Sequence, residues 1–447
     1  MPEDNRPVDR RDVLKLVGAG GLAGLAGCAG GGGGGGSSQY PSLGNYPVEG
    51  DEVVFGFNVP QSGSYSQEGT DELRGYNLAK DHLNNGGGWV DSVSDLSGNG
   101  VLDKTVTSVE GDTATNAEQA RQEAQRMISR DNAIMVTGGS SSAVAIAVQE
   151  LCQKEKVMFM ACLTHSNDTT GSACVRYSFR EMFNAYMTGQ ALAPVLAEEF
   201  GSNLNFYQLY ADYTWGATVQ SSMQQFLEKQ GWTQTNAVAT PLGTSDYSSF
   251  LANVPRDETD VLLLVHYGLD AANSLPQAIE AGLNEDMKIV VPLYNRLMAN
   301  AARDSIGGIY GTAEWNWQLE NSASQTFVES FQSEYDKVPS YAARLAYVQT
   351  LQYAAAVERA GTFYPPEVIR QLEDYDYSGF GLGQETMRGC DHQAQHDVLV
   401  VQGLPRSEQT ENKRLQVVSQ TPRDDIGYAC DAGPAAECSL GKYGDES

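Results

Sequence analysis

Residues 133–161 read AIMVTGGSSSAVAIAVQELCQKEKVMFMA and alternate between two kinds of apolar pattern. The short apolar run Ala133–Thr137 predicts a buried strand, and Val157–Ala161 predicts another. Between them, a Gly/Ser loop leads into Ser142–Gln153, where the spacing of apolar residues predicts a helix. This order is typical of a parallel sheet that is covered by helices.

The same alternation extends along the chain in both directions. Toward the amino terminus we expect strands over 53–59 and 104–109 and helices over 70–83 and 116–129, the second capped by Asn116. Toward the carboxyl terminus a second series is expected: helices over 185–199, 216–229, 247–254 and 271–281, and strands over 205–209, 261–266 and 288–291. Two series exceed one ordinary sheet, so the sequence predicts two doubly wound α/β lobes.

The end of the chain is expected to complete both lobes. Helical patterns over 324–335, 341–360 and 366–372 would return to cover the first lobe, followed by short strands over 381–388 and 398–401. Lobes connected by more than one crossing form a hinge. The expected segments are a signal over 1–27, a tether over 28–50, a first lobe from 51–182 and 317–378, a second lobe from 183–316 and 379–403, and a tail over 404–447.

The charge balance is strongly acidic. Of 447 residues, 57 are acidic and 29 are basic, which gives a net charge of −28. Such a chain would repel nucleic acid instead of binding its phosphates, so nucleic acid is excluded as a partner. The acidic residues are spread evenly, which favours a surface solvated in high salt over an acidic interaction tail.

The amino terminus resembles an export signal. Consecutive arginines at Arg10 and Arg11 precede a short apolar run that ends in small residues before Cys28, a pattern similar to a twin-arginine signal with a lipobox. We expect the chain to be extracytoplasmic and anchored to the outer face of the cell membrane by lipidated Cys28. Gly30–Gly36 would form a flexible tether. The alternative is a short membrane anchor that is never cleaved.

Cysteine usage agrees with export. Six cysteines follow Cys28, at positions 152, 162, 174, 390, 430 and 438, and permit up to three disulfides. Cys162 with Cys174 and Cys430 with Cys438 each flank a loop and are plausible local pairs, although a free buried thiol is also plausible. The absence of a C-x-x-C motif gives little support to zinc, and we expect no metal or cofactor.

A series of short motifs resembles one known family. They occur in this order: Ser62-Gly63-Ser64, Arg74-Gly75, Gly138 to Ser142, His165 to Asp168, Trp215-Gly216 and Asp391-His392-Gln393. Together they are similar to the branched-chain amino acid and amide binding proteins of ABC importers, over about residues 51–403. The resemblance implies a type I periplasmic binding fold, a small amino acid or amide held between the lobes, and an ABC permease as partner.

The resemblance also implies ligand contacts in the first lobe. Amides and hydroxyls at Ser141 and Ser142 begin a helix, where an anion is favoured, and Ser142 matches the family's carboxylate-binding serine. The alternative for Ser142 is an ordinary helix cap. Leu163, Thr164 and His165 match a second contact loop, although a single histidine is often structural.

Further contacts are expected at the edge of the cleft and in the second lobe. Glu68 stands where some leucine-binding relatives have an aromatic residue; it would bind an ammonium or an amide, or it is a solvated surface acid. Tyr213, Trp215, Tyr267 and Tyr294 follow expected strands of the second lobe and would close on the ligand, unless they only pack that lobe.

Enzymatic functions have less support. The sequence has no G-x-S-x-G elbow before a helix, no H-E-x-x-H motif and no P-loop, so we expect a binding protein and not an enzyme. A hydrolase that uses Ser141 or Ser142 with His165 and Asp168 is the strongest enzymatic alternative. Chemosensory binding without transport is a closer alternative.

Replacement of the expected lipidation site tests the anchoring. Cys28→Ser removes the only thiol near the amino terminus that could carry a lipid. We expect a folded protein that no longer partitions with membranes in cell fractionation, whereas an Ala29→Ser control remains bound. A Cys28→Ser protein that stays fully membrane-bound would instead indicate an uncleaved anchor.

Overall fold

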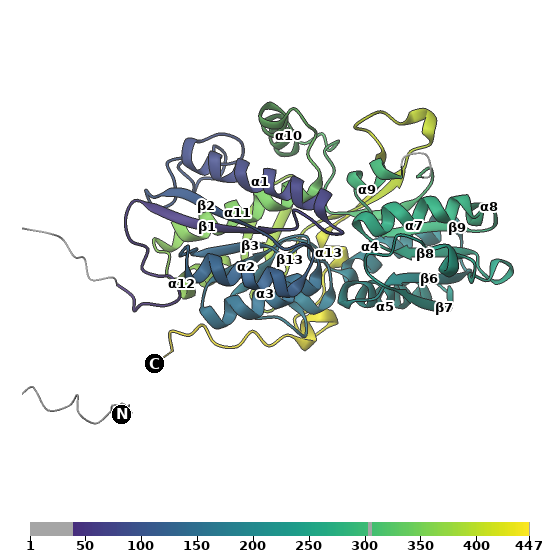
Figure 1. Ribbon diagram of the computed structural model, residues 1–447, viewed down its shortest axis with the longest axis horizontal. Helices are drawn as coiled ribbons and strands as arrows, with labels where there is room; N and C mark the ends of the chain where they lie inside the picture. The colour runs from purple at the N-terminus through teal and green to yellow at the C-terminus, as the bar shows by residue number, and fades with distance from the viewer. Residues whose placement is uncertain (1–38, 303–305, 447) are drawn as a thin grey trace, which may run out of the picture. The chain divides into compact units, whose positions relative to one another are not determined.

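The first lobe is built on a five-stranded parallel sheet with the strand order β2-β1-β3-β4-β5 (Figure 1). The computed structural model describes residues 39–302 and 306–446, so the expected signal, Cys28 and the glycine run lie outside the described residues. The strands are β1 (Glu52–Val59), β2 (Thr105–Asp112), β3 (Met135–Gly138), β4 (Met158–Ala161) and β5 (Ser178–Arg180).

Helices cover both faces of this sheet. Because successive side chains of a strand point to opposite faces, Met135 and Met158 pack beneath α1 (Ser66–Asn85) and α11 (Tyr341–Ala360). Val136 and Phe159 pack in a separate core with α2 (Ala117–Ser129) and α3 (Ser142–Glu155). The expected cap of α2 is confirmed, since Asn116 accepts a hydrogen bond from the Gln119 amide.

The second lobe is built on a seven-stranded sheet with the order β15-β14-β10-β9-β8-β6-β7. Its parallel strands are β6 (Asn205–Ala211), β7 (Thr233–Thr240), β8 (Val261–Val265), β9 (Lys288–Leu293) and β10 (Tyr310–Ala313). Antiparallel β14 (Val398–Gly403) and β15 (Leu415–Thr421) complete one edge. Its helices are α4 (Ala185–Phe200), α5 (Thr214–Lys229), α6 (Ser248–Leu251), α7 (Gly268–Glu280), α8 (Leu283–Asp286) and α9 (Arg296–Ala301).

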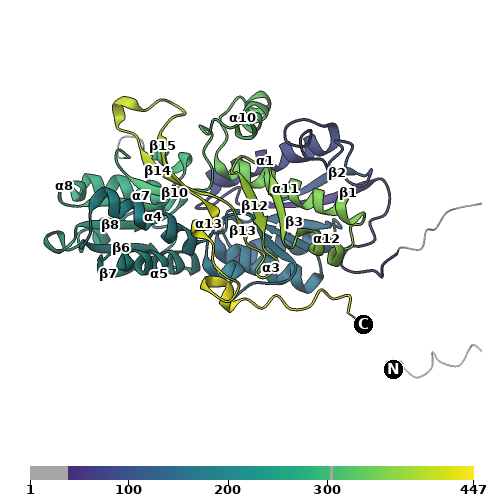
Figure 2. The same ribbon diagram turned by 180° about the vertical axis from the view of Figure 1, so that it is seen from behind.

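The chain crosses between the two sheets four times, as Figures 1 and 2 show. It leaves the first sheet after β5 and returns after β10 through α10 (Ser322–Tyr335), α11 and α12 (Pro365–Leu372). A small antiparallel sheet follows, with strands β11 (Tyr375–Ser378), β12 (Gln384–Met387) and β13 (Ala394–Gln395). The chain then enters β14 and, after β15, returns to the first lobe, where Cys438 is bonded to Cys174. The expected multiple crossings are therefore present.

Two expectations about local structure are corrected. The helix expected over 247–254 is only the single turn α6, and the strand expected over 381–388 is confined to β12. Strands β5, β10, β11, β13 and β15 were not predicted. β5 and β10 are three and four residues long, and their pairing depends on neighbours that are distant in the sequence.

The expected local disulfides are wrong. Cys174 pairs with Cys438 and Cys390 pairs with Cys430, at Cα–Cα distances of 5.5 Å and 6.0 Å. Cys152 and Cys162 are free and buried. Cys162 follows β4 and is fully buried in the core of the first lobe, whereas Cys174 is bonded to Cys438. Both disulfides fix the carboxyl-terminal segment to distant parts of the chain.

Residues 40–50, in the second half of the expected tether, contact the first lobe. Asn45 donates to the backbone carbonyls of Ile128 and Ala133. The Tyr40 ring stacks on the Tyr364 ring, with 4.6 Å between the ring centroids. These contacts fix residues 40–50 beside the amino end of β3.

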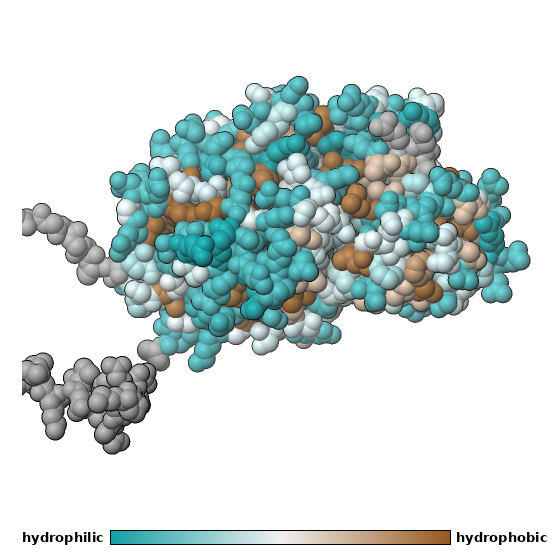
Figure 3. Space-filling model, viewed as in Figure 1, coloured by the Kyte–Doolittle hydropathy of each residue, from teal (hydrophilic) through white to brown (hydrophobic). Residues whose placement is uncertain are grey.

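The surface is mostly polar. On the face shown in Figure 3, hydrophilic residues dominate and hydrophobic ones form small groups. Leu269 and Val418 are the large hydrophobic side chains that are exposed among the described residues. Within the same residues, no helix combines the length and the apolar character that a membrane crossing requires.

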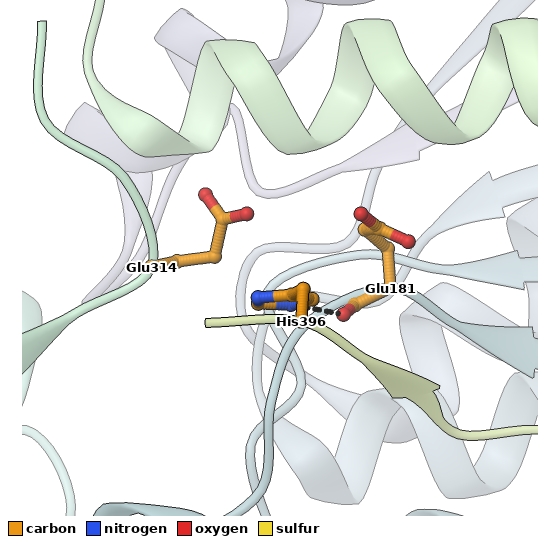
Figure 4. Close-up of side chains that lie close together, drawn as sticks. All are labelled: Glu181, Glu314 and His396. Carbon is orange, nitrogen blue, oxygen red and sulfur yellow. Dashed lines mark hydrogen bonds between the residues drawn. The ribbon is translucent and has the colours of Figure 1, made fainter. Parts of the chain in front are cut away.

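A buried ion-pair cluster joins the crossings. Arg344 of α11 is fully buried and donates to Glu181 after β5 (3.3 Å), to Glu314 after β10, and to Glu385 of β12 (2.7 Å). His396, before β14, lies beside Glu181 and Glu314 (Figure 4). We call Glu181, Glu314, Arg344, Glu385 and His396 the hinge cluster.

The hinge cluster is an ion-pair network. Ligand atoms of Glu181, Glu314 and His396 lie within 4.8 Å of one another, which is close enough for a metal ion. However, Arg344 already donates to both carboxylates, and the two ring nitrogens of His396 face the backbone carbonyls of Asp397 (2.8 Å) and Glu181 (3.0 Å). The guanidinium therefore already pairs with both carboxylates of this group.

Removal of the guanidinium should strongly destabilise the fold. Arg344→Met leaves three buried carboxylates without their cation, so we expect the free energy of unfolding to fall by about 3–5 kcal/mol in denaturant titration. The control Arg256→Met removes an exposed partner of Asp286 and should cost less than about 1 kcal/mol. Equal losses in the two variants would show that the hinge cluster does not stabilise the fold.

Candidate functional site

The loop from β3 into α3 has a backbone that brings its polar groups to the edge of the sheet. Gly138, Gly139 and Ser141 have φ values of 123°, 94° and 90°. A Cβ on Gly138 would lie 2.0 Å from the Asn58 carbonyl oxygen, so only glycine fits there. Ser141 occupies the cap position of α3 but forms no side-chain cap bond, and Ser142 is the first helical residue. The hydroxyl of Ser142 accepts from the Ser166 amide at 3.1 Å, so it does not cap the helix.

A histidine and a tryptophan connect the two lobes. The Trp215 Nε1–H group, at the start of α5, donates to His165 Nδ1 at 2.9 Å. His165 Nε2 therefore carries the hydrogen and donates to the Thr188 hydroxyl at 2.8 Å. Burial, and secondarily the charge of Arg180, holds the pKa of His165 well below its usual value. His165 is thus a neutral ring that contacts the second lobe through Trp215.

Glu68 is buried, so the surface-acid alternative is wrong. It lies in the first turn of α1 and is 1% exposed. Its carboxylate accepts from Asn295 Nδ2 of the second lobe at 3.0 Å, and the same nitrogen lies 2.8 Å from the Tyr267 hydroxyl. Tyr267 in turn lies 2.9 Å from the hydroxyl of Tyr341. Burial raises the pKa of Glu68 to about 7, although the Asn295 hydrogen bond opposes this shift.

Glu72 is a second buried carboxyl group, and the sequence analysis missed it. It lies one helical turn after Glu68 and is fully buried. One carboxylate oxygen accepts from the Ser140 hydroxyl, whereas the other has no hydrogen-bond partner among the described residues. Burial raises the pKa of Glu72 to about 8. The four-residue spacing from Glu68 could have indicated Glu72 as a site residue, because this spacing places both carboxyl groups on one face of the helix.

Tyrosines close the gap between the lobes. The hydroxyl oxygens of Tyr65 and Tyr213 are 2.6 Å apart, and the Tyr65 ring lies edge-on to Tyr267 at 5.4 Å. The Leu269 amide also donates to the Ser64 carbonyl at 3.1 Å. The structure therefore shows the lobes in direct contact.

Four expected site residues form no side-chain hydrogen bond between the lobes within the described part of the chain. The Thr164 hydroxyl bonds within its own loop to the Thr169 hydroxyl at 2.9 Å. Ser141 and Leu163 are buried and have positive φ angles. The hydroxyl of Tyr294 is buried without a partner among the described residues. Next to Tyr294, Asn295 and Tyr341 is a cavity of about 20 Å³, which is room for about one water molecule. These residues therefore leave no room for an amino acid between them in this arrangement of the lobes.

The comparisons with known proteins agree with this two-lobed arrangement. A model of the periplasmic binding protein family matches residues 52–408. The chain belongs to this family. It is 22% identical over 282 residues to the Leu/Ile/Val-binding protein homolog 4 of Brucella melitensis, which covers 60% of this chain and 67% of that protein.

Solved periplasmic binding proteins have the same fold. One from Burkholderia mallei superposes with a TM-score of 0.78 at 22% identity and covers 87% of this chain and all of that chain. A leucine-binding protein from Thermotoga maritima gives a TM-score of 0.70 at 19% identity, over 83% of this chain and 99% of that one. A solute-binding protein from Rhodopseudomonas palustris, in complex with 3,4-dihydroxybenzoic acid, gives 0.72 at 15% identity, over 84% and 98%. The chain therefore has the expected type I periplasmic binding fold.

The residues of the hydrolase alternative do not form a triad in this binding protein. Trp215 and Thr188 occupy the two nitrogens of His165, and the Ser142 hydroxyl bonds to the Ser166 amide. Asp168 accepts from the Thr214 hydroxyl. No base is therefore in contact with the Ser142 hydroxyl among the described residues.

The buried carboxyls predict a pH dependence of stability. Above the ordinary pKa of 4.5 the unfolded chain loses these protons, whereas the folded chain keeps them until about pH 7 at Glu68 and about pH 8 at Glu72. Because the folded state then binds more protons, the free energy of unfolding should fall as the pH rises from about 4.5 to about 8.

Glu72→Gln tests this dependence because an amide cannot ionise. The variant should unfold with a shallower decline between pH 5 and pH 8 than the wild type in denaturant titrations. Glu150→Gln, which changes an exposed glutamate of α3, should keep the wild-type slope. An unchanged slope in Glu72→Gln would contradict the assignment.

Proposed function

We propose that this chain is the extracytoplasmic substrate-binding component of an ABC importer. It captures a small amino acid of the branched-chain type or an amide between its lobes and delivers it to the permease. Lipidated Cys28 would keep the protein near the permease at the outer face of the membrane. Family membership and the names of the Brucella relatives support this proposal.

The observation that carries the proposal is the set of polar contacts between facing loops. Glu68 and His165 of the first lobe bond to Asn295 and Trp215 of the second. These residues lie at or beyond the carboxyl ends of parallel strands, where α/β proteins commonly bind ligands. Separation of the lobes would release these polar groups, and a ligand would replace the contacts on closure.

The four crossings support a closing motion. They pass through one region, where the hinge cluster binds three of them together. A rotation about this region would open the cleft with little change inside either sheet, as expected for hinge closure. The buried cleft residues belong to both lobes. A ligand that contacts both lobes would therefore favour the closed state through its binding free energy.

Alanine substitutions on the two lobes test the position of the site. If Ser142 binds a ligand carboxylate, Ser142→Ala should weaken binding by about 1.5–3 kcal/mol, through loss of a hydrogen bond to a charged group. This corresponds to about a tenfold to more than a hundredfold higher Kd in calorimetry. Trp215→Ala should also weaken binding, because it removes the indole that contacts His165.

Ser129→Ala, at the exposed end of α2, is the control and should bind like the wild type. Ligand recovered from the titration should be chemically unchanged. Unchanged affinity in both site variants would show that the site has been misplaced, and Ser142-dependent conversion of the ligand would favour the hydrolase.

A further inference from the structure

We propose that the ligand carries a cationic N–H-bearing group, as a basic amino acid or a small guanidinium compound does, and that Glu68 and Glu72 bind this group. The inference rests on the proposed capture of a small ligand between the lobes, and it replaces the branched-chain side chain of that ligand with a cationic one. It is carried by two buried carboxyl groups on one face of α1 that form no salt bridge with the described residues. Arg296, which lines the small cavity beside Asn295, donates to the Val338 carbonyl and pairs with neither of them.

The two carboxyl groups lack the partners that buried acids normally have. Both are essentially inaccessible, and neither forms a salt bridge with any described residue. Glu68 is bonded to the neutral amide of Asn295, and Glu72 to the neutral hydroxyl of Ser140. The second carboxylate oxygen of Glu72 has no partner within the described part of the chain. Burial of a carboxylate is costly unless a cation or several donors compensate it.

The surroundings of Glu72 are neutral or acidic. Its polar neighbours are Ser140 in the loop before α3, Cys162 after β4, and Tyr76 and Glu68 on its own helix. His165, the imidazole of the cleft, is neutral and is occupied by Trp215 and Thr188. The raised pKa values of Glu68 and Glu72 are consistent with these surroundings.

Most of the other buried acids have an arginine partner; the exception is Asp270, which accepts from the Gly243 amide. Arg344 binds the three carboxylates of the hinge cluster, and Arg388 lies 3.0 Å from buried Asp391. Asp71, between the two cleft acids in sequence, pairs with Arg74 at 2.9 Å. Only at the cleft do fully buried glutamates of the described residues lack an arginine. A cation that arrives with the ligand would supply the missing partner.

The start of α3 favours a ligand that also has a carboxylate. The start of α3 has no side-chain cap, and Ser142 lies in its first turn. A basic amino acid has one carboxylate for this end and two cationic groups for the two acids. A leucine side chain would instead bring hydrocarbon to a carboxyl group, and a benzoate would bring a like charge.

Calorimetry at pH 7.5 with a fixed panel tests the proposal. The panel contains L-arginine, L-lysine and agmatine as cations, L-leucine, L-isoleucine and L-valine as apolar amino acids, and L-glutamate, 4-hydroxybenzoate and urea. We expect the tightest cation to bind at least tenfold more tightly than any other member of the panel. Glu72→Gln and Glu68→Gln should each weaken that cation about tenfold or more and should change leucine binding less.

The controls separate two kinds of failure. Glu150→Gln should leave cation binding unchanged, and thermal melts establish that each variant is folded. Tighter binding of leucine, isoleucine, valine, urea or an anion than of any cation would overturn the cationic class but support the proposed binding function. Cation binding that neither glutamine variant weakens would overturn the assignment of Glu68 and Glu72. If no panel member binds the wild type, the proposed function fails together with this inference.

Discussion

The burial of one guanidinium among three carboxylates constrains the whole structure. Arg344 comes from a helix of the first lobe, whereas Glu181 and Glu314 stand where the chain leaves one sheet for the other. Charges that are removed from water must stay paired, because an unpaired one costs several kcal/mol. The crossings are therefore held at one point, and the two lobes are joined there without being fused along their facing surfaces.

The contacts that face the cleft are of a different kind. Glu68 with Asn295, Trp215 with His165, and Tyr65 with Tyr213 are single hydrogen bonds between groups that can bond equally well to water or to a ligand. Each has a small net free energy, typically about 1 kcal/mol. The cleft can therefore open at low cost, while the hinge cluster stays intact. This difference in strength is what a two-state binding protein requires.

The sequence predicted the features that depend on local patterns. The helices over 142–153, 185–199 and 341–360 lie close to α3, α4 and α11 because apolar spacing along a helix is visible in one segment. Strands β5, β10 and β15 were missed because short or polar strands are defined by pairing with distant segments. The disulfides were wrong for a related reason, since residues near 430–438 are placed by the fold and not by sequence proximity.

The candidate site was partly predictable. His165 and Trp215 were expected as ligand contacts, and they bond to each other across the lobes. Asn295 and Tyr341 follow no motif, and their place in the site is visible only in three dimensions. Glu72 had a helical spacing signal but no chemical one, because its neighbours Ser140 and Cys162 are distant in the sequence.

Small-angle scattering with and without the tightest-binding compound of the ligand panel tests the central claim most directly. The account predicts that the ligand-free protein has the larger radius of gyration and that saturation with ligand yields a more compact particle, matching the closed structure. If the scattering curves with and without saturating ligand superimpose, and the ligand-free protein is already as compact as the closed structure, lobe closure about the hinge cluster is contradicted.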